Sequence, residues 1–171
     1  MTTGAKDDIL PHHSVYWPIM RTTLLLAFAC LTSLPAADST KPLFWSAGQT
    51  KDAVKKLPAK VNPERHLATE RFIDSAFIAY RDGNGEAELH EKQADLIFFQ
   101  EGEGVVLVGG KMMEGKSTGP DEQRGKAIEG GTRYPVTAGD TLYIPANVVH
   151  QFQLEPGKHF TATVVKITPK P

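Results

Sequence analysis

The chain has 171 residues, of which 40% are hydrophobic and 23% are charged, and its formal net charge is −1. A chain of this length can bury one sizeable core, so these values predict one globular domain with a short extension. Positive and negative residues are scattered, with no basic stripe that could neutralise phosphates. This pattern argues against a nucleic-acid partner and leaves a small neutral molecule or a modest anion as the expected ligand.

The N-terminal region predicts export. Arg21 precedes an apolar run at 24–31, and small residues follow before Asp38. These are the parts of a secretory signal peptide, and the run is shorter than the roughly 20 residues that span a bilayer. We therefore expect residues 20–37 to be a signal peptide and the mature protein to be periplasmic or secreted and free of the membrane. The alternative is a buried helix in a cytoplasmic protein.

Two consequences follow from a signal peptide that begins at Met20. Residues 1–19 have no place in it, so we interpret them as a non-native or unstructured extension that comes from start-site assignment. Cys30 is the single cysteine of the chain and would be lost on cleavage. A mature chain without cysteine has no disulfide, no thiolate nucleophile and no zinc–cysteine site.

Residues 38–66 are expected to form a helical extension to the main domain. The segment 45–57 has the pattern of one amphipathic helix, in which Ser46 can cap the start, Val54 and Leu57 lie on the apolar stripe, and Pro58 ends the helix. The segment carries no convergent polar groups. We therefore expect it to cover the outside of the domain and to take no part in catalysis.

The main domain, at 67–171, has the pattern of short strands separated by glycine turns. The segment 71–80 is rich in aromatic and branched residues, and 82–85 has the composition of a hairpin turn. The irregular segment 114–131 is expected to be a long loop in which 125–128 could pair as an edge strand. Further strands are expected at 86–90, 95–100, 104–113, 132–136, 141–145, 148–155 and 160–168. This is an all-β pattern of the sandwich or barrel kind.

Strand periodicity predicts which polar side chains meet. Alternate residues share a face, so Glu88 lies with His90, Asp95 lies with Ile97, and His150 lies with Phe152. If the apolar face is the interior, two carboxylates and two imidazoles enter an apolar cavity. Burial without compensation would cost several kcal/mol per charge. Either a divalent cation or a hydrogen-bonded network of the four side chains must therefore pair them.

Two stretches, 88–104 and 139–150, resemble the two motifs of the cupin superfamily. Gly102 follows Asp95 by seven positions and Pro145 follows Gly139 by six, as in those motifs, whereas Glu88 stands where the first histidine of the family's His-x-His pair would be. The resemblance spans roughly 68–167. It implies a double-stranded β-helix, that is, a jelly-roll barrel, and a homodimer. It also implies that the four metal ligands are Glu88, His90, Asp95 and His150.

Imidazole nitrogen with carboxylate oxygen suits iron, manganese, zinc, nickel or copper. One function is then a metal-dependent dioxygenase, isomerase or decarboxylase of a small organic molecule, with a substrate wall formed by Phe99, Tyr143 and Phe152. The alternative is a metal-free barrel that binds or senses a small molecule without turnover. His66 and His159 fall in connecting segments and are expected to face solvent.

Overall fold

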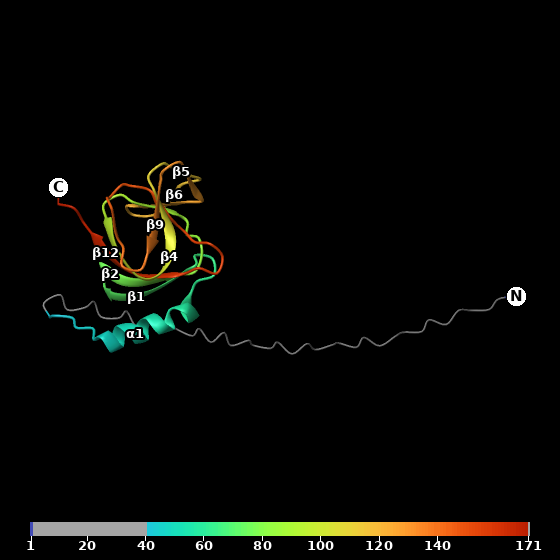
Figure 1. Ribbon diagram of the computed structural model, residues 1–171. Coiled ribbons are helices and arrows are strands. Elements are labelled where there is room, and N and C mark those ends of the chain that lie inside the picture. The colour runs from blue at the N-terminus through green and yellow to red at the C-terminus, as the bar shows by residue number, and fades with distance from the viewer. Residues whose placement is uncertain (2–40, 171) are drawn as a thin grey trace. The chain divides into compact units, whose positions relative to one another are not determined.

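The computed structural model describes residue 1 and residues 41–170 (Figure 1). The predicted extension at 1–19, apart from Met1, and the predicted signal peptide at 20–37 lie outside the described residues, so both stay predictions. Within the described part of the chain, no helix is long and apolar enough to cross a membrane.

One helix precedes the strands, as predicted. Helix α1 (Ala47–Lys56) begins with a capping box, in which the Gln49 backbone N–H donates to Ser46 Oγ at 3.2 Å and the Ser46 N–H donates to Gln49 Oε1 at 3.0 Å. The helix ends at Leu57, and the short 3-10 helix η1 (Pro58–Lys60) follows. Leu57 is fully buried in a small core with Ile78 of the sheet, so this extension covers the outer face of strands β1 and β2.

The rest of the described chain is built from antiparallel strands, and the predicted fold class, an all-β jelly-roll barrel with a short N-terminal helix, is confirmed (Figure 1). The main sheet has the order β1-β2-β12-β4-β11-β3-β7-β6, with β9 and β10 also paired to β4, and β5 pairs with β8 separately. The strands are β1 (Leu67–Ile73), β2 (Ala76–Arg81), β3 (Ala87–His90), β4 (Ala94–Val108), β5 (Lys111–Met113), β6 (Lys116–Gly119), β7 (Glu122–Gly125), β8 (Ala127–Glu129), β9 (Thr132–Thr137), β10 (Thr141–Ile144), β11 (His150–Gln153) and β12 (Phe160–Ile167).

Strand β4 joins the two layers of the barrel. Its first half pairs with β10 and β12, and its second half pairs with β9 and β11. The bend falls at Gly102, whose φ is +76° and where an added Cβ would lie 1.9 Å from the carbonyl oxygen of His159. Only glycine combines this backbone conformation with so close an approach. The two strands expected at 95–100 and 104–113 are therefore one bent strand followed by β5.

Three other sequence predictions need correction. The segment 71–80 is the end of β1, a turn and β2, because these two strands form a hairpin. The segment 82–85 is no hairpin turn, since β2 and β3 pair with other strands, and Asn84 Oδ1 instead accepts a hydrogen bond from the Leu154 N–H. The segment 114–131 is ordered into β6, β7 and β8. Strands β6 and β7 form a hairpin beside β3, and β8 pairs with β5.

The barrel core is built by alternation along the strands. Ile97 and Phe99 of β4 are buried with Phe152 of β11 and Phe160 of β12. Asp95 lies on the face of Ile97, and His150 lies on the face of Phe152, as the period of two requires. The same alternation that forms the apolar core therefore brings polar side chains to one end of it.

Candidate metal centre

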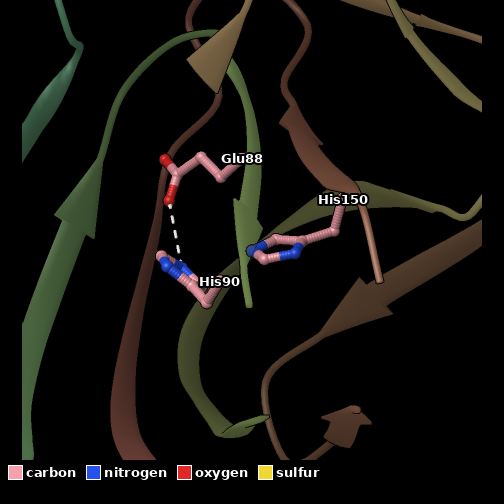
Figure 2. Close-up of side chains that lie close together, drawn as sticks. All are labelled: Glu88, His90 and His150. Carbon is pink, nitrogen blue, oxygen red and sulfur yellow. Dashed lines mark ion pairs between the residues drawn. The ribbon is translucent and has the colours of Figure 1, made fainter. Parts of the chain in front are cut away.

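Four polar side chains from three strands meet at one end of the barrel interior. Glu88 and His90 are alternate residues of β3, Asp95 begins β4, and His150 begins β11 opposite Glu88. Figure 2 shows Glu88, His90 and His150 pointing toward one another. His150 is 1% exposed and Asp95 is 4% exposed. The structure thus brings together all four residues that the sequence predicted as ligands.

The Glu88 carboxylate divides its two oxygens between cations and histidine. Its Oε1 lies 3.0 Å from Arg124 Nη1 and 3.7 Å from Arg81 Nη2, whereas its Oε2 lies 3.7 Å from His90 Nε2 (Figure 2). Burial acts to raise the pKa of Glu88, but Arg124, His150 and Arg81 outweigh that effect and hold it below its usual value. Glu88 is therefore ionised, with one oxygen free to act as a ligand.

The Asp95 carboxylate is divided in the same way. Its Oδ1 lies 2.5 Å from Lys166 Nζ, and its Oδ2 lies 3.6 Å from His90 Nε2 and 3.4 Å from His150 Nε2. The lysine holds the outer oxygen, and the inner oxygen is shared between the two imidazoles. An outer partner of this kind fixes the orientation of a carboxylate ligand.

Both imidazoles offer an unpartnered nitrogen to the same place. His150 Nδ1 lies 3.2 Å from the carbonyl oxygen of Val148, and because a carbonyl oxygen only accepts, Nδ1 is the donor in this contact. Burial, followed by the charge of Lys166, lowers the pKa of His90, which favours its neutral form. The Nε2 atoms of His90 and His150 are buried and lack a hydrogen-bond partner in the described chain. An imidazole nitrogen without a hydrogen-bond partner is the kind of atom that binds metal.

The separations fit a metal ion. Bonds of about 2.0–2.2 Å place neighbouring ligand atoms about 3.3–3.6 Å apart at tetrahedral angles and about 2.8–3.1 Å apart at octahedral angles. The separations here, 3.4–3.7 Å, are close to the tetrahedral values. Ligand atoms of Glu88, His90 and His150 all lie within 4.8 Å of one another. Asp95 is outside that mutual group, yet it is near both histidines. Glu88, His90 and His150 could therefore hold a metal ion together, and Asp95 lies beside them on the side of the two histidines.

Two cavities adjoin the cluster. An inner cavity of about 60 Å³ lies within the barrel and is lined by Glu88 and Asp95 together with Arg81 and Lys166. An outer cavity of about 300 Å³ is lined by His90 and by loop residues around Pro120. A larger groove of about 670 Å³ contains none of the four ligands. The cluster is therefore bordered by two cavities, Glu88 and Asp95 lining one and His90 lining the other.

The predicted aromatic wall holds only in part. Phe152 lines the inner cavity, and Phe99 is buried behind it against Phe160, which also lines the cavity. Tyr143 is 53% exposed, and its neighbour Ile144 is buried. Because alternate residues of β10 face opposite sides, Tyr143 lies on the outer surface and is not a wall of the cavity.

Sequence reasoning missed the three cations that hold the carboxylates. Arg81 shares a face of β2 with Phe77 and Ala79, and Lys166 shares a face of β12 with Val164, so alternation could have placed both in the interior. Arg124 comes from β7, which had been expected to be loop. Of the other two histidines, His66 is exposed and paired with Asp82, and His159 is half-buried against Tyr80. Neither joins the cluster.

Three comparisons with known proteins were made. No protein-family model matches the chain. No curated protein matches it. Among solved structures, similar chains include a predicted oxalate decarboxylase from Thermotoga maritima, with 14% identity and a TM-score of 0.39 over 55% of this chain and 65% of that one. The chain thus spans less than two thirds of that protein.

Two further structures have similar values. The polyketide cyclase RemF from Streptomyces resistomycificus has 19% identity and a TM-score of 0.43, over 64% of this chain and 74% of that one. The cupin domain of Cnp3 from Schizosaccharomyces pombe has 10% identity and a TM-score of 0.43, over 66% and 72%. Likenesses this distant carry no argument about function, which has to come from the chain's own geometry.

Proposed function

We propose that this cupin-like barrel binds one divalent metal ion through His90, His150, Glu88 and Asp95, and that it binds a small organic molecule beside the ion. One observation carries the proposal: two buried imidazole nitrogens without partners face the free oxygens of two ionisable carboxylates. A buried lone pair that makes no hydrogen bond is costly. A metal ion would satisfy both nitrogens and both oxygens together.

The surrounding cations prepare the carboxylates for this role. Arg124 and Lys166 each hold one oxygen of a carboxylate, which keeps Glu88 and Asp95 oriented. A second carboxylate among the ligands favours a harder ion such as manganese or iron over copper. The ion would act there as a Lewis acid or oxygen activator, for a dioxygenase, isomerase or decarboxylase reaction. The chain's own residues would bind and orient the organic molecule and exclude water from the inner cavity.

The charge balance favours an anionic molecule. Arg81, Arg124 and Lys166 are paired with Glu88, Asp95 and the Glu122 carboxylate, which lies 2.6 Å from Arg124, and Arg124 also lies 3.8 Å from Glu86. Against these four carboxylates the three cations leave one negative charge, so a divalent ion leaves one positive charge in excess around the site. An anionic ligand reduces that excess, because uncompensated charge in a buried site is unfavourable.

A metal-free binding barrel is the second candidate, and the same ion pairs favour it. Lys166 lies 2.5 Å from Asp95, and Arg124 lies 3.0 Å from Glu88, so each buried carboxylate already has a counter-ion. In this alternative the four side chains only shape a pocket. It leaves the two unpartnered Nε2 atoms unexplained.

Elemental analysis decides between the two. The protein should be purified without a histidine tag and before any contact with chelator. About one equivalent of iron, manganese, nickel, copper or zinc is expected. The ion would bind the folded protein and not the unfolded chain, so its binding would stabilise the fold. Less than about a tenth of an equivalent, unchanged after incubation with each metal, would contradict metal binding and favour the metal-free barrel.

We also propose that the chain is exported after cleavage of a signal peptide at 20–37 and that it forms a homodimer. The basic start and short apolar run support export, and the exposed Phe98 and Tyr143 on the outside of the sheet support pairing of two copies. N-terminal sequencing of the natural protein tests the first point. A fragment that begins before Met20 would contradict it. Sedimentation at micromolar concentration tests the second, and a monomer there would contradict it.

A further inference from the structure

We propose that the inner cavity is a binding subsite for a small carboxylate and that Arg81 is the residue that anchors it. The inference deepens the proposed function, on which it rests for its place beside the metal ion, by naming the ligand class. The anchoring contact itself involves only residues of the chain, so it can be tested with or without metal.

Arg81 is buried but poorly satisfied. It is 4% exposed, and its one side-chain hydrogen bond to a described residue runs from Nη1 to the carbonyl oxygen of Arg65 at 3.1 Å. The nearest carboxylate oxygen, on Glu88, is 3.7 Å from Nη2, which is too long for a hydrogen bond. A guanidinium has five N–H donors, so most of those of Arg81 are available. No Arg81 atom is among the buried unpaired polar atoms of the described chain, and Arg81 lines the inner cavity. Its free donors therefore open on that cavity, where a bound carboxylate would accept two of them.

The guanidinium is held in place at the cavity wall. It lies over the Phe152 ring, 5.1 Å from the ring centroid. On its other side Gly85 is fixed by two hydrogen bonds, from its N–H to the carbonyl oxygen of Phe152 at 2.9 Å and from Gln151 Nε2 to its own carbonyl oxygen at 2.8 Å. A Cβ at Gly85 would lie 2.5 Å from Arg81 Nη1. The absence of a side chain at Gly85 thus leaves the space that the guanidinium occupies.

The cavity dimensions limit the ligand. About 60 Å³ lies between Arg81, Lys166 and the apolar side chains of Phe77, Phe160 and Val164. This space holds about four to six non-hydrogen atoms, judged by the volume that one water-sized group needs. A carboxylate with one or two further carbons fits, with its oxygens on Arg81 and its carbon end on the apolar wall. Lys166 adds a second positive group to the lining, although it is already paired with Asp95.

A metal ion at the four ligands would strengthen this subsite. Without metal, Arg81 and Lys166 are balanced by Glu88 and Asp95 at the cavity wall. A divalent ion on the inner carboxylate oxygens leaves the positive charges in excess, so the anion and the metal should each increase the affinity for the other. Such coupling is reciprocal by thermodynamic necessity.

The test measures binding of ¹³C-labelled acetate to the full chain by NMR titration, at constant ionic strength with chloride as the competing anion. It compares wild type with Arg81→Met, and with Arg65→Met as a matched control, because Arg65 is exposed and contributes only its carbonyl to the Arg81 contact. Wild type should bind acetate saturably. Arg81→Met should weaken binding roughly ten- to a hundredfold, the effect of losing hydrogen bonds to a charged group, whereas Arg65→Met should bind as wild type does.

A second variant keeps the proposal testable if Arg81→Met does not fold. Gly85→Ala retains the charge and displaces only the flexible end of Arg81, so it should fold and still weaken acetate binding at least tenfold. Acetate affinity equal to wild type in every folded variant, or no saturable binding by wild type, would overturn the inference.

Metal content measured on the same samples separates this inference from the proposed function. Acetate binding that depends on Arg81 in a protein without metal would support the subsite and contradict the metal proposal. A metal-loaded protein that binds acetate equally well with and without the Arg81 side chain would support the metal proposal and contradict the subsite.

Discussion

The pair between Lys166 and Asp95 provides a sharp test of the site, because the metal and metal-free accounts predict different results for one substitution. Lys166→Met keeps the length of the side chain and removes its charge. Asp95 Oδ1 lies 2.5 Å from Lys166 Nζ, and Asp95 is 4% exposed. Loss of the partner therefore leaves a buried carboxylate without a counter-ion whenever metal is absent.

The expected size of the effect follows from that burial. Removing one partner of a buried ion pair costs about 3–5 kcal/mol, and for a domain of this size that lowers Tm by about 10 °C or more. In the metal-bound protein the ion pairs with Asp95 instead, so the loss of Tm should be smaller. Lys166 also orients Asp95, and the loss of such an outer partner weakens metal affinity about ten- to a hundredfold. Removal of a positive charge a few ångströms from a divalent ion is the larger effect, at about 4 kcal/mol or more, so metal affinity should rise at least tenfold, or about 1.4 kcal/mol.

The assay is thermal unfolding with and without saturating Mn²⁺, together with a titration of Mn²⁺ affinity. Lys158→Met is the matched control, since Lys158 is paired with Glu103 at 2.6 Å on the exposed surface and should change neither quantity measurably. If Lys166→Met lowered the Tm equally with and without Mn²⁺ and left the affinity for Mn²⁺ unchanged or weaker, the reasoning about the metal would be refuted.

Three further predictions test other parts of the account. His150→Ala should abolish stoichiometric metal binding in elemental analysis and remove the stabilisation by metal, whereas His66→Ala, at an exposed histidine, should do neither. Metal retained by His150→Ala would contradict the ligand assignment. The pKa of Glu88 is lowered in the folded state, so in metal-free protein its contribution to stability is complete above the unfolded pKa of about 4.5 and is lost as the pH falls through the lower folded value. In urea unfolding across pH 3–6, wild type should lose more stability toward acid than Glu88→Gln, and equal losses in the two proteins would contradict this. Gly102→Ala should cost at least about 3 kcal/mol in urea unfolding and Gly157→Ala only about 1 kcal/mol, because both have positive φ but only at Gly102 would an added Cβ collide with a backbone carbonyl oxygen, that of His159. Equal losses would show that the bend of β4 does not depend on that approach.

Local pattern was enough to predict an all-β domain in which the four polar side chains converge, whereas the jelly-roll fold and the role of these side chains as metal ligands came from the resemblance to the cupin motifs. A period of two places Glu88 with His90 and Asp95 with Ile97, and the turn residues around them indicate short strands. Tyr143 was assigned to the wrong face because its aromatic character was weighed and its alternation with Ile144 was not. The sequence divided β4 in two because Gly102 has the local signature of a turn, whereas in the structure it bends one strand between two layers.

The cations around the site were not predicted from the sequence, for a different reason. Arg124 reaches Glu88 only because β7 pairs with β3, a contact between segments that are far apart in the chain. Arg81 and Lys166 could have been placed inside the barrel by alternation, but charged residues are so often exposed that the pattern alone gives little reason to bury them. An ion pair between residues of two paired strands can be identified only when the strand order of the sheet is known.

Anomalous X-ray diffraction from crystals of the natural protein equilibrated with Mn²⁺ tests the central claim most directly. The account predicts one anomalous peak within about 2.0–2.3 Å of His90 Nε2 and His150 Nε2, with Glu88 Oε2 and Asp95 Oδ2 completing the ligand set while Arg124 and Lys166 keep the outer oxygens. No peak at this cluster at full Mn²⁺ saturation, with the two Nε2 atoms bonded instead to water or to the carboxylates, would contradict it.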